Sequence, residues 1–339
     1  AVGAAIGGNY AFVLTGFCVL ASWGVFAATG NTFGLDYLAF GPFMGPHIAF
    51  AGGVAAAIYA RYRGHLGDGK DVNTPLAGIG HPDILCVGAA LGIFGYLCQI
   101  GISNIPWFGK HTDPVALTVL LSGLLARLIF GGVPGKGLFH GSLHNPELFH
   151  ENATSFPAKI KPGPNGRWLE WQEKPSQLLT IGSLFGIFAG GASLFLAANV
   201  GAYLTTRGLA NNLAAANANS FCFGISAVII LFLITNRNMP VQHHVTNIAG
   251  LAAVQFFPLL MGKTLTTYHW TYTSSWDSHT WGMATVALVI AAFFGVFTAG
   301  LGEFCARLWY NRGTSHIDPP AAAIWLGNTV VVSLATLFS

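Results

Sequence analysis

Residues 178–203 read LLTIGSLFGIFAGGASLFLAANVGAY, an apolar run without a charged side chain. A helix of about 20 apolar residues crosses the hydrocarbon core of a bilayer, so this run is long enough to span one. Comparable runs recur along the chain, and we predict an all-α, polytopic transmembrane helical bundle with nine spans. The predicted spans are 9–29, 41–60, 83–103, 114–132, 178–203, 219–236, 246–262, 282–308 and 319–338.

The seventh predicted span differs from the others because it is short and contains Gln255 and Pro258. A proline inside a helix removes one backbone hydrogen bond and bends the helix. Irregular backbone is tolerated at membrane depth only where protein or water surrounds it. We therefore expect the seventh span to be kinked or re-entrant.

The amino-acid composition excludes a water-soluble protein. The 339 residues include 15 basic and 12 acidic side chains, 8 % in all, whereas about 25 % of the residues of an ordinary soluble domain are charged. Hydrophobic residues make up 53 %, and the mean hydropathy is +0.57. So few charges cannot cover the surface of a soluble domain. A net charge of +3 without a basic stripe also excludes a nucleic-acid binder.

The basic residues predict the orientation in the membrane. With the N-terminus inside, eleven Lys and Arg residues fall in inner loops and three fall in outer loops. Loops rich in Lys and Arg stay on the cytoplasmic side. We expect an integral protein of a photosynthetic or bacterial inner membrane with its N-terminus on that face. Near it, Arg127 is expected to extend toward the membrane surface, and Glu303 to pair with Arg307 on one helix face.

We expect one membrane domain over residues 1–339, with two long connections. The inner loop 133–177 is rich in glycine, proline and aromatic residues, and the outer loop 263–281 is dense in tryptophan and tyrosine, as membrane interfaces are. The sequence shows no convincing internal repeat and no separate soluble domain. The five cysteines form no CxxC pair, so we expect no disulfide framework.

Twelve histidines, most of them at the ends of predicted spans, are the most informative feature of a chain so poor in charge. The magnesium of chlorophyll takes one axial ligand, often a neutral imidazole. His47 leads GPHIAFAGGVAAAIY, whose small side chains leave room for a flat ring. The candidate ligands are His47, His65, His81, His243, His244 and His279, with the polar residues of apolar runs, Gln99, Asn199, Gln255 and Asn328.

Other interpretations of the same residues stay open. His140, His144 and His150 lie close together in the inner loop and, with the pair His243 and His244, could bind copper, zinc or non-haem iron. That site, or haem b held by paired histidines, predicts a subunit of a metal-dependent membrane oxidoreductase or monooxygenase. The near absence of charge inside the spans also suits a channel or transporter for a small neutral solute.

Four segments resemble chlorophyll-binding helices of the photosystem I-type core antenna and of the six-helix chlorophyll antenna family. They are SQLLTIGSLFGIFAGGASLFLAANVGAY at 176–203, ISAVIILFLITNRNMP at 225–240, SSWDSHTWGMATVALVIAAFFGVF at 274–297 and HIAFAGGVAAAIYARYRG at 47–64. The resemblance implies a subunit that binds chlorophyll and carotenoid for light harvesting and excitation transfer, with no chemistry of its own. Under each of these hypotheses, an apolar surface with so few polar groups also predicts other membrane subunits of a larger complex, and lipids, as partners.

Overall fold

The computed structural model describes residues 1–131, 168–235, 238–311, 313 and 315–338. Every named element of this described part is helical, and an isolated bridge between Gly69 and Ser315 is its only β-type pairing. The main helices are α2 (Gly8–Thr29), α3 (Ala49–Tyr62), α4 (Pro82–Ser103), α6 (Pro114–Ala126), α8 (Pro175–Thr206), α9 (Leu213–Thr235), α10 (His243–Leu260), α11 (Ser278–Cys305) and α12 (Pro319–Leu337). The prediction of an all-α bundle is confirmed.

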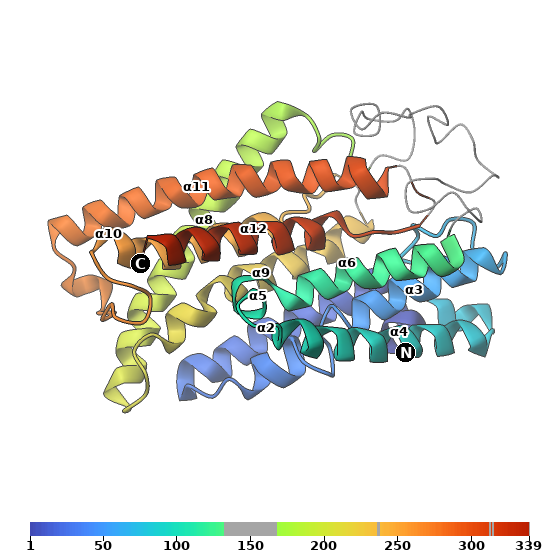
Figure 1. Cartoon of the computed structure of the whole chain (residues 1–339), viewed down its shortest axis with the longest axis horizontal. Coiled ribbons are helices and arrows are strands. Elements are labelled where there is room, and N and C mark those ends of the chain that lie inside the picture. Colours follow the sequence, from blue (N-terminus) through green and yellow to red (C-terminus); the bar gives the residue numbers. More distant parts are fainter. Residues whose placement is uncertain (132–167, 236–237, 312, 314, 339) are drawn as a thin grey trace.

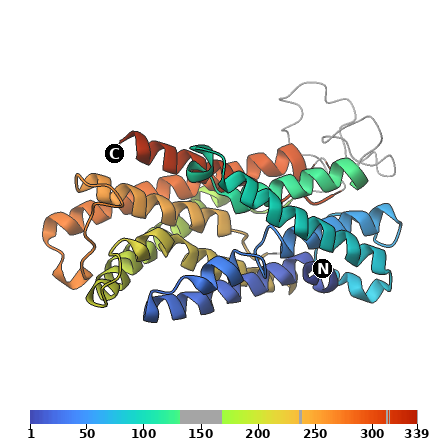
Figure 2. The same cartoon turned by 60° about the horizontal axis from the view of Figure 1, so that its bottom comes forward.

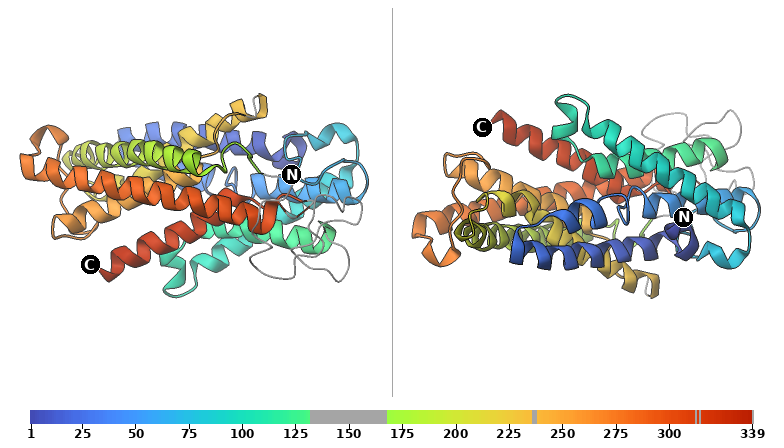
Figure 3. Two further views of the ribbon diagram at one scale, coloured as in Figure 1. Left: turned by 90° about the horizontal axis from the view of Figure 1, so that it is seen from above. Right: turned by 90° about the horizontal axis from the view of Figure 1, so that it is seen from below.

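Short helical segments connect or extend these helices. They are α1 (Val2–Ile6), η1 (Gly34–Ala39), η2 (Leu76–Ile79), α5 (Phe108–His111), η3 (Arg127–Gly131), η5 (Thr273–Ser275) and η6 (Ala306–Tyr310). Figure 1 shows that most of the helices run along the long axis of the molecule. Seen from above in Figure 3, α8 lies beside α11, and the two pack closely. In Figure 2 the C-terminal helix α12, in red, lies by the green α6, with which it is in contact.

Seven helices of the described chain are long and apolar enough to cross a membrane. They are α2, α4, α6 continued by η3, α8, α9, α11 continued by η6, and α12. The structure is therefore compatible with an integral membrane protein. Seven of the nine predicted spans correspond to these helices.

The second and seventh predicted spans correspond to α3 and α10, which differ from the other seven. The helix predicted from residue 41 begins only at Ala49, because the preceding GPFMGP, with two prolines and two glycines, interrupts helical hydrogen bonding. Pro258 lies in the last turn of α10, and only four residues of that helix are not buried: Gln255, Phe256, Leu259 and Leu260. These two helices face protein on most sides, so they tolerate small or polar residues that lipid would not.

Two expectations about charged residues meet different outcomes. Arg127 does not extend to the surface: it is 1 % exposed and donates hydrogen bonds to the backbone oxygens of Trp309 and Ser315, both at 2.7 Å. That expectation is wrong because these carbonyl groups satisfy the guanidinium inside the protein. Glu303 and Arg307 do form the expected pair, with a nitrogen–oxygen distance of 2.5 Å.

Two halves of the described chain carry matching segments in the same order. The matches are GFCVLAS at 16–22 with SFCFGIS at 220–226, PHIAFAGGVAA at 46–56 with HHVTNIAGLAA at 243–253, GAALGIFGYLC at 88–98 with GVFTAGLGEFC at 295–305, and HTDPVA at 111–116 with HIDPPA at 316–321. The first half comprises α2, α3, α4 and α6, and the second α9, α10, α11 and α12. The expectation of no internal repeat is therefore wrong.

Helices α2 and α9 contact each other reciprocally. Gly16 of α2 packs on Ala227 of α9. Under the match of segment 16–22 to 220–226, the equivalent pair is Trp23 with Ser220, and Trp23 Nε1 donates a hydrogen bond to Ser220 Oγ at 2.8 Å. Such exchange of equivalent partners is the signature of a two-fold axis. Because the contacts also run in opposite chain directions, α2 and α9 are antiparallel.

Helices α6 and α12 repeat this arrangement. Thr112, just before the start of α6, and Thr329, in the second half of α12, are joined by a hydrogen bond of 2.9 Å between their Oγ1 atoms. At the other end, Gly123 of α6 packs on Ile317, the residue equivalent to Thr112. The two halves are thus inverted repeats, the architecture in which many membrane transporters place their binding site between the repeats.

Candidate functional site

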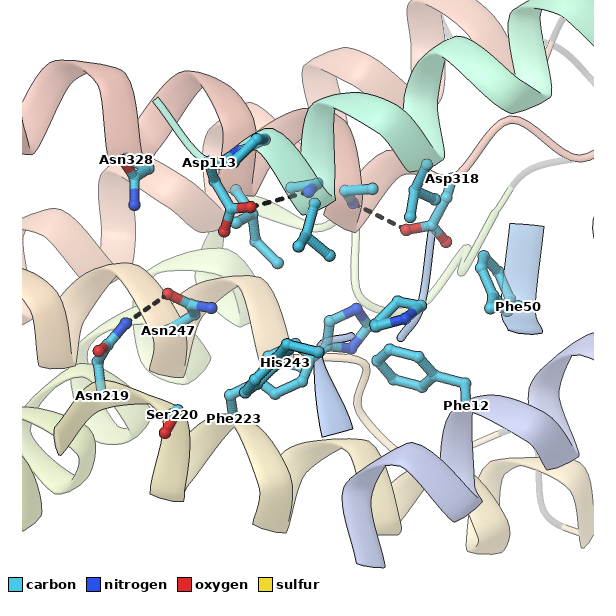
Figure 4. Close-up of a pocket in the computed structure, with 18 of the residues that line it drawn as sticks. Phe12, Phe50, Asp113, Asn219, Ser220, Phe223, His243, Asn247, Asp318 and Asn328 are labelled. Atoms are coloured by element: carbon cyan, nitrogen blue, oxygen red, sulfur yellow. Dashed lines mark hydrogen bonds between the residues drawn. The ribbon is translucent and has the colours of Figure 1, made fainter. Parts of the chain in front are cut away.

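A cavity of about 290 Å³ lies where the two repeats meet (Figure 4). Its wall is built from α2, α3 and α6 of the first half, from α9, α10 and α12 of the second, and from the loop before α3. Five pairs of equivalent positions line it from both halves: Pro46 with His243, Phe50 with Asn247, Asp113 with Asp318, Ala116 with Ala321, and Val119 with Ile324. We call it the central cavity. The first half contributes apolar groups where the second contributes His243 and Asn247.

Two aspartates of the repeated HxDP segment line the central cavity. Each precedes a proline, whose fixed φ favours the first helical turn, and each caps a helix. Asp113 Oδ1 accepts a hydrogen bond from the Ala116 N–H, and Asp318 Oδ2 from the Ala321 N–H, both at 2.8 Å. Capping therefore holds both carboxylates at the cavity wall, and Figure 4 shows them apart from each other, at the starts of two antiparallel helices.

The surroundings of the two carboxylates differ. The second oxygen of Asp318 lies 3.2 Å from His316 Nε2. The equivalent histidine of the first half, His111, lies elsewhere: it stacks on Trp107 with a ring separation of 4.3 Å, and its Nδ1 lies 2.7 Å from the Trp107 carbonyl oxygen. Within the described chain no ion pair involves Asp113.

His243 is the most buried titratable side chain of the cavity wall. It is 6 % exposed, and its ring packs 4.8 Å from the Phe12 ring. No hydrogen bond to either ring nitrogen is formed by the described residues, and Nδ1 is fully buried. Beside it, Asn219 Nδ2 donates a hydrogen bond to Asn247 Oδ1 at 2.9 Å. The wall thus offers unused imidazole nitrogen together with amide groups.

The charged residues of the central cavity restrict which molecules it can bind. Among its described lining residues are two aspartates and no lysine or arginine. An anion entering this space would meet like charge in a poorly hydrated environment, where repulsion is strong. The cavity therefore favours uncharged polar or cationic molecules.

Two further cavities lie between the central cavity and the loops, and each shares lining residues with the next. A small one of about 50 Å³ shares Phe12, Phe50, His243 and Asp318 with the central cavity. A large one of about 930 Å³ shares Asn9, Trp168, Leu233 and His316 with the small one. Because exposed residues such as Asp68 and Glu170 line the large cavity, it opens to solvent, and we call it the vestibule. Phe12 and Phe50 stand between the central cavity and the small one, because both cavities are lined by them.

The vestibule also contains a perturbed lysine. Lys70 lies at its wall, and its ammonium sits 4.6 Å from the centre of the Tyr310 ring. Burial lowers the pKa of Lys70 to about 8, because the charged ammonium loses hydration there. The neighbouring carboxylate of Asp68 opposes this shift, and the guanidinium of Arg127 adds to it.

Of the ten candidate pigment ligands, only His243 and Asn328 line the central cavity. His47 and His244 occupy equivalent repeat positions away from it, fully buried and without a hydrogen-bond partner for either ring nitrogen among the described residues. Both rings pack tightly: a Cβ on Gly302 would lie 2.7 Å from His244 Nε2, and one on Gly45 would lie 2.5 Å from His47 Cε1.

The remaining candidates are dispersed. His65 and His81 stack on each other with ring centres 3.8 Å apart, and His279 is exposed. Gln99 and Asn199 form hydrogen bonds with residues of their own helices, and Asn199 also with Thr273. Gln255 lines a separate cavity beside Thr264 and Thr336.

The metal hypothesis receives no support from the described part of the chain. No group of three or more His, Cys, Asp or Glu side chains there could hold a metal ion. His140, His144 and His150 lie outside the described residues.

Sequence reasoning missed the two aspartates and the asparagine pair, Asn219 with Asn247. The repetition of HxDPxA before α6 and α12 is the signal that could have found the aspartates. The asparagines lie inside long apolar runs, and nothing in their spacing distinguishes them from the asparagines that face lipid or other helices.

The whole chain, residues 1–339, matches the model of a family described as a family of unknown function (DUF7973), and the chain belongs to that family. Comparison with curated proteins and with solved structures finds no match.

Proposed function

We propose that the protein is a membrane transporter that moves a small uncharged or cationic solute through the central cavity. The observation that supports this proposal is the position of the cavity, which is lined by equivalent residues of two inverted repeats. A small cavity that shares lining residues with both separates it from the vestibule. In transporters of this architecture, one repeat rocks against the other around a site at their interface.

The size and charge of the cavity restrict the solute. A volume of about 290 Å³ is at the lower limit of ordinary small-molecule pockets, which span about 300–1,000 Å³. The two aspartates disfavour anions, and Asn219, Asn247 and Asn328 offer hydrogen bonds to a polar molecule. This supports the predicted small-solute transporter and extends it to cations.

The orientation and surroundings belong to the same proposal. The vestibule lies among loops 68–75 and 168–171, on the side that the distribution of basic residues predicts to be inside. Exposed apolar side chains of the spans, such as Ile93, Val289 and Phe293, contact lipid in this arrangement. Association with other membrane subunits stays a prediction.

Thiol accessibility tests this proposal without a known substrate. Cys18, Cys86 and Cys98 are first replaced by serine, and Asn328→Cys then places a thiol in the central cavity. A membrane-impermeant, positively charged methanethiosulfonate should modify it in proteoliposomes. Val289→Cys, 65 % exposed on the outer face of α11, is the control and should stay unmodified, because a thiol ionises only in water. Absence of modification from both sides of the membrane contradicts the proposal.

A second candidate function is supported by one specific observation. The ring nitrogens of His47 and His244 have no hydrogen-bond partner among the described residues, and the pigment-binding antenna subunit would use such nitrogens as axial ligands once the close packing around the rings opens. The visible absorption spectrum of protein purified from its native membrane tests it, and a preparation without a red chlorophyll band contradicts it. The oxidoreductase alternative depends on residues outside the described part and stays a prediction.

A further inference from the structure

We infer that the central cavity binds a monovalent cation, Na⁺ or a proton, at Asp113. This inference rests on the proposed transport function and specifies its coupling ion. It follows from the different surroundings of two carboxylates that occupy the same position in the two repeats.

Asp318 has a neighbouring imidazole, and Asp113 has no basic neighbour among the described residues. His316 Nε2 lies 3.2 Å from Asp318, whereas the equivalent His111 is held by Trp107. The capping N–H of Ala116 and the helix dipole offset only part of the Asp113 charge, since the N-terminus of a helix carries about half a unit charge. A carboxylate at the centre of an apolar bundle needs a proton or a cation to complete its neutralisation. We therefore place the bound cation next to Asp113, where it takes the role that the His316 imidazole has next to Asp318.

His243 provides an independent indication of an occupant. Its side chain is more than nine-tenths buried and lines the central cavity, and its Nδ1 is buried without a hydrogen-bond partner among the described residues. Buried polar atoms without a partner are rare in proteins and mark places where a ligand or water completes the structure. A hydrated cation, or a proton delivered by water, supplies that partner.

The other polar groups of the cavity suit a hard cation. The side chains of Thr112 and Asn328 bring oxygen atoms to the same wall, and no sulfur ligand lines it among the described residues. Oxygen atoms are the preferred ligands of hard cations. Thr112 and Asn328 come from opposite repeats, so occupation of the site would join the two halves of the molecule.

Thermal unfolding of the purified full-length chain tests the inference without any transport measurement. NaCl is titrated against N-methyl-D-glucamine chloride at constant ionic strength, and the unfolding midpoint is recorded. A ligand that binds only the folded state raises the midpoint in a saturable way. We expect saturation with Na⁺ in the wild type and, in Asp113→Asn, a half-saturating concentration at least tenfold higher.

Asparagine keeps the helix cap, so Asp113→Asn removes the charge and leaves the local fold. Asp277→Asn is the matched control. Asp277 caps α11 through the Thr280 N–H at 2.8 Å, but it is exposed and does not line the central cavity. Its half-saturating Na⁺ concentration should stay within twofold of the wild type.

The arms of the experiment separate the two cations. If the unfolding midpoint does not change with Na⁺ but changes with pH, and this pH dependence is lost in Asp113→Asn, the bound cation is a proton. Two results would overturn the inference. The first is a wild-type unfolding midpoint that changes with neither Na⁺ nor pH, which needs no folded Asp113→Asn. The second is an equal response of the midpoint to Na⁺ and pH in Asp113→Asn and Asp277→Asn. Because thiol modification of Asn328→Cys requires only that water reaches the central cavity, such a failure leaves the proposed transport function standing.

Discussion

Asp113 and Asp318 occupy the same position in two inverted repeats and accept the same capping hydrogen bond, at 2.8 Å, from Ala116 and Ala321. One geometry thus serves two purposes. The cap stabilises the start of a helix inside the bundle, and it also fixes a carboxylate at the wall of the central cavity. The functional difference between the two halves therefore comes from the neighbours of the carboxylates rather than from their backbone positions.

The capping role predicts a graded effect of substitutions at Asp113. Asp113→Ala removes both charge and cap, and should lower the free energy of unfolding by about 1 kcal/mol more than Asp113→Asn, which keeps an oxygen that can accept the Ala116 N–H. Unfolding in mixed detergent micelles measures both variants. Equal stabilities would show that the cap contributes nothing.

Close contact between α8 and α11 predicts a severe effect of a single added methyl group. A Cβ on Gly295 would lie 2.2 Å from the backbone oxygen of Gly182. Backbone cannot move aside cheaply, so Gly295→Ala should lower the free energy of unfolding by about 1–3 kcal/mol. Gly300→Ala, on the same helix with open space around it, is the control and should be neutral or stabilising by up to about 1 kcal/mol. Similar losses in both variants would contradict the packing seen here.

The lowered pKa of Lys70 predicts reactivity at moderate pH. Burial disfavours the ammonium form, so the neutral, nucleophilic amine should dominate above about pH 8 rather than above the ordinary lysine pKa of 10.5. Acylation of Lys70, followed by mass spectrometry of the native protein between pH 6 and pH 11, should show a midpoint near the lower value, within about one unit. A midpoint above pH 10 would mean that the vestibule wall is well hydrated at this lysine.

The position of Phe50 between two cavities predicts control of access to the centre. Phe50 borders both the central cavity and the small cavity that leads toward the vestibule. Phe50→Ala should widen this passage and speed thiol modification of Asn328→Cys from the vestibule side severalfold. Phe293→Ala, on the lipid-facing surface with its side chain 64 % exposed, should leave the rate unchanged. An unchanged rate in Phe50→Ala would place the barrier elsewhere.

The apolar runs alone determined the all-α bundle and seven of its long helices. In a bilayer every span must satisfy its own backbone hydrogen bonds and present apolar side chains to lipid, and both requirements can be read residue by residue along the chain. The second requirement does not apply to α3 and α10, which face protein, so the start and surroundings of these two helices were predicted less well. The expected pairing of Glu303 with Arg307 held because it depends only on spacing within one helix.

Only the tertiary structure decided which polar residues meet. Asp113 and Asp318 are separated by most of the chain, and the two-fold packing of α6 on α12 brings both to one cavity. The histidines show the same limit: His47, His243 and His244 all stand at or just before the start of a helix, yet only His243 faces the central cavity. Local sequence specifies the helix and the cap, but burial and partners depend on helices that pack from the other repeat.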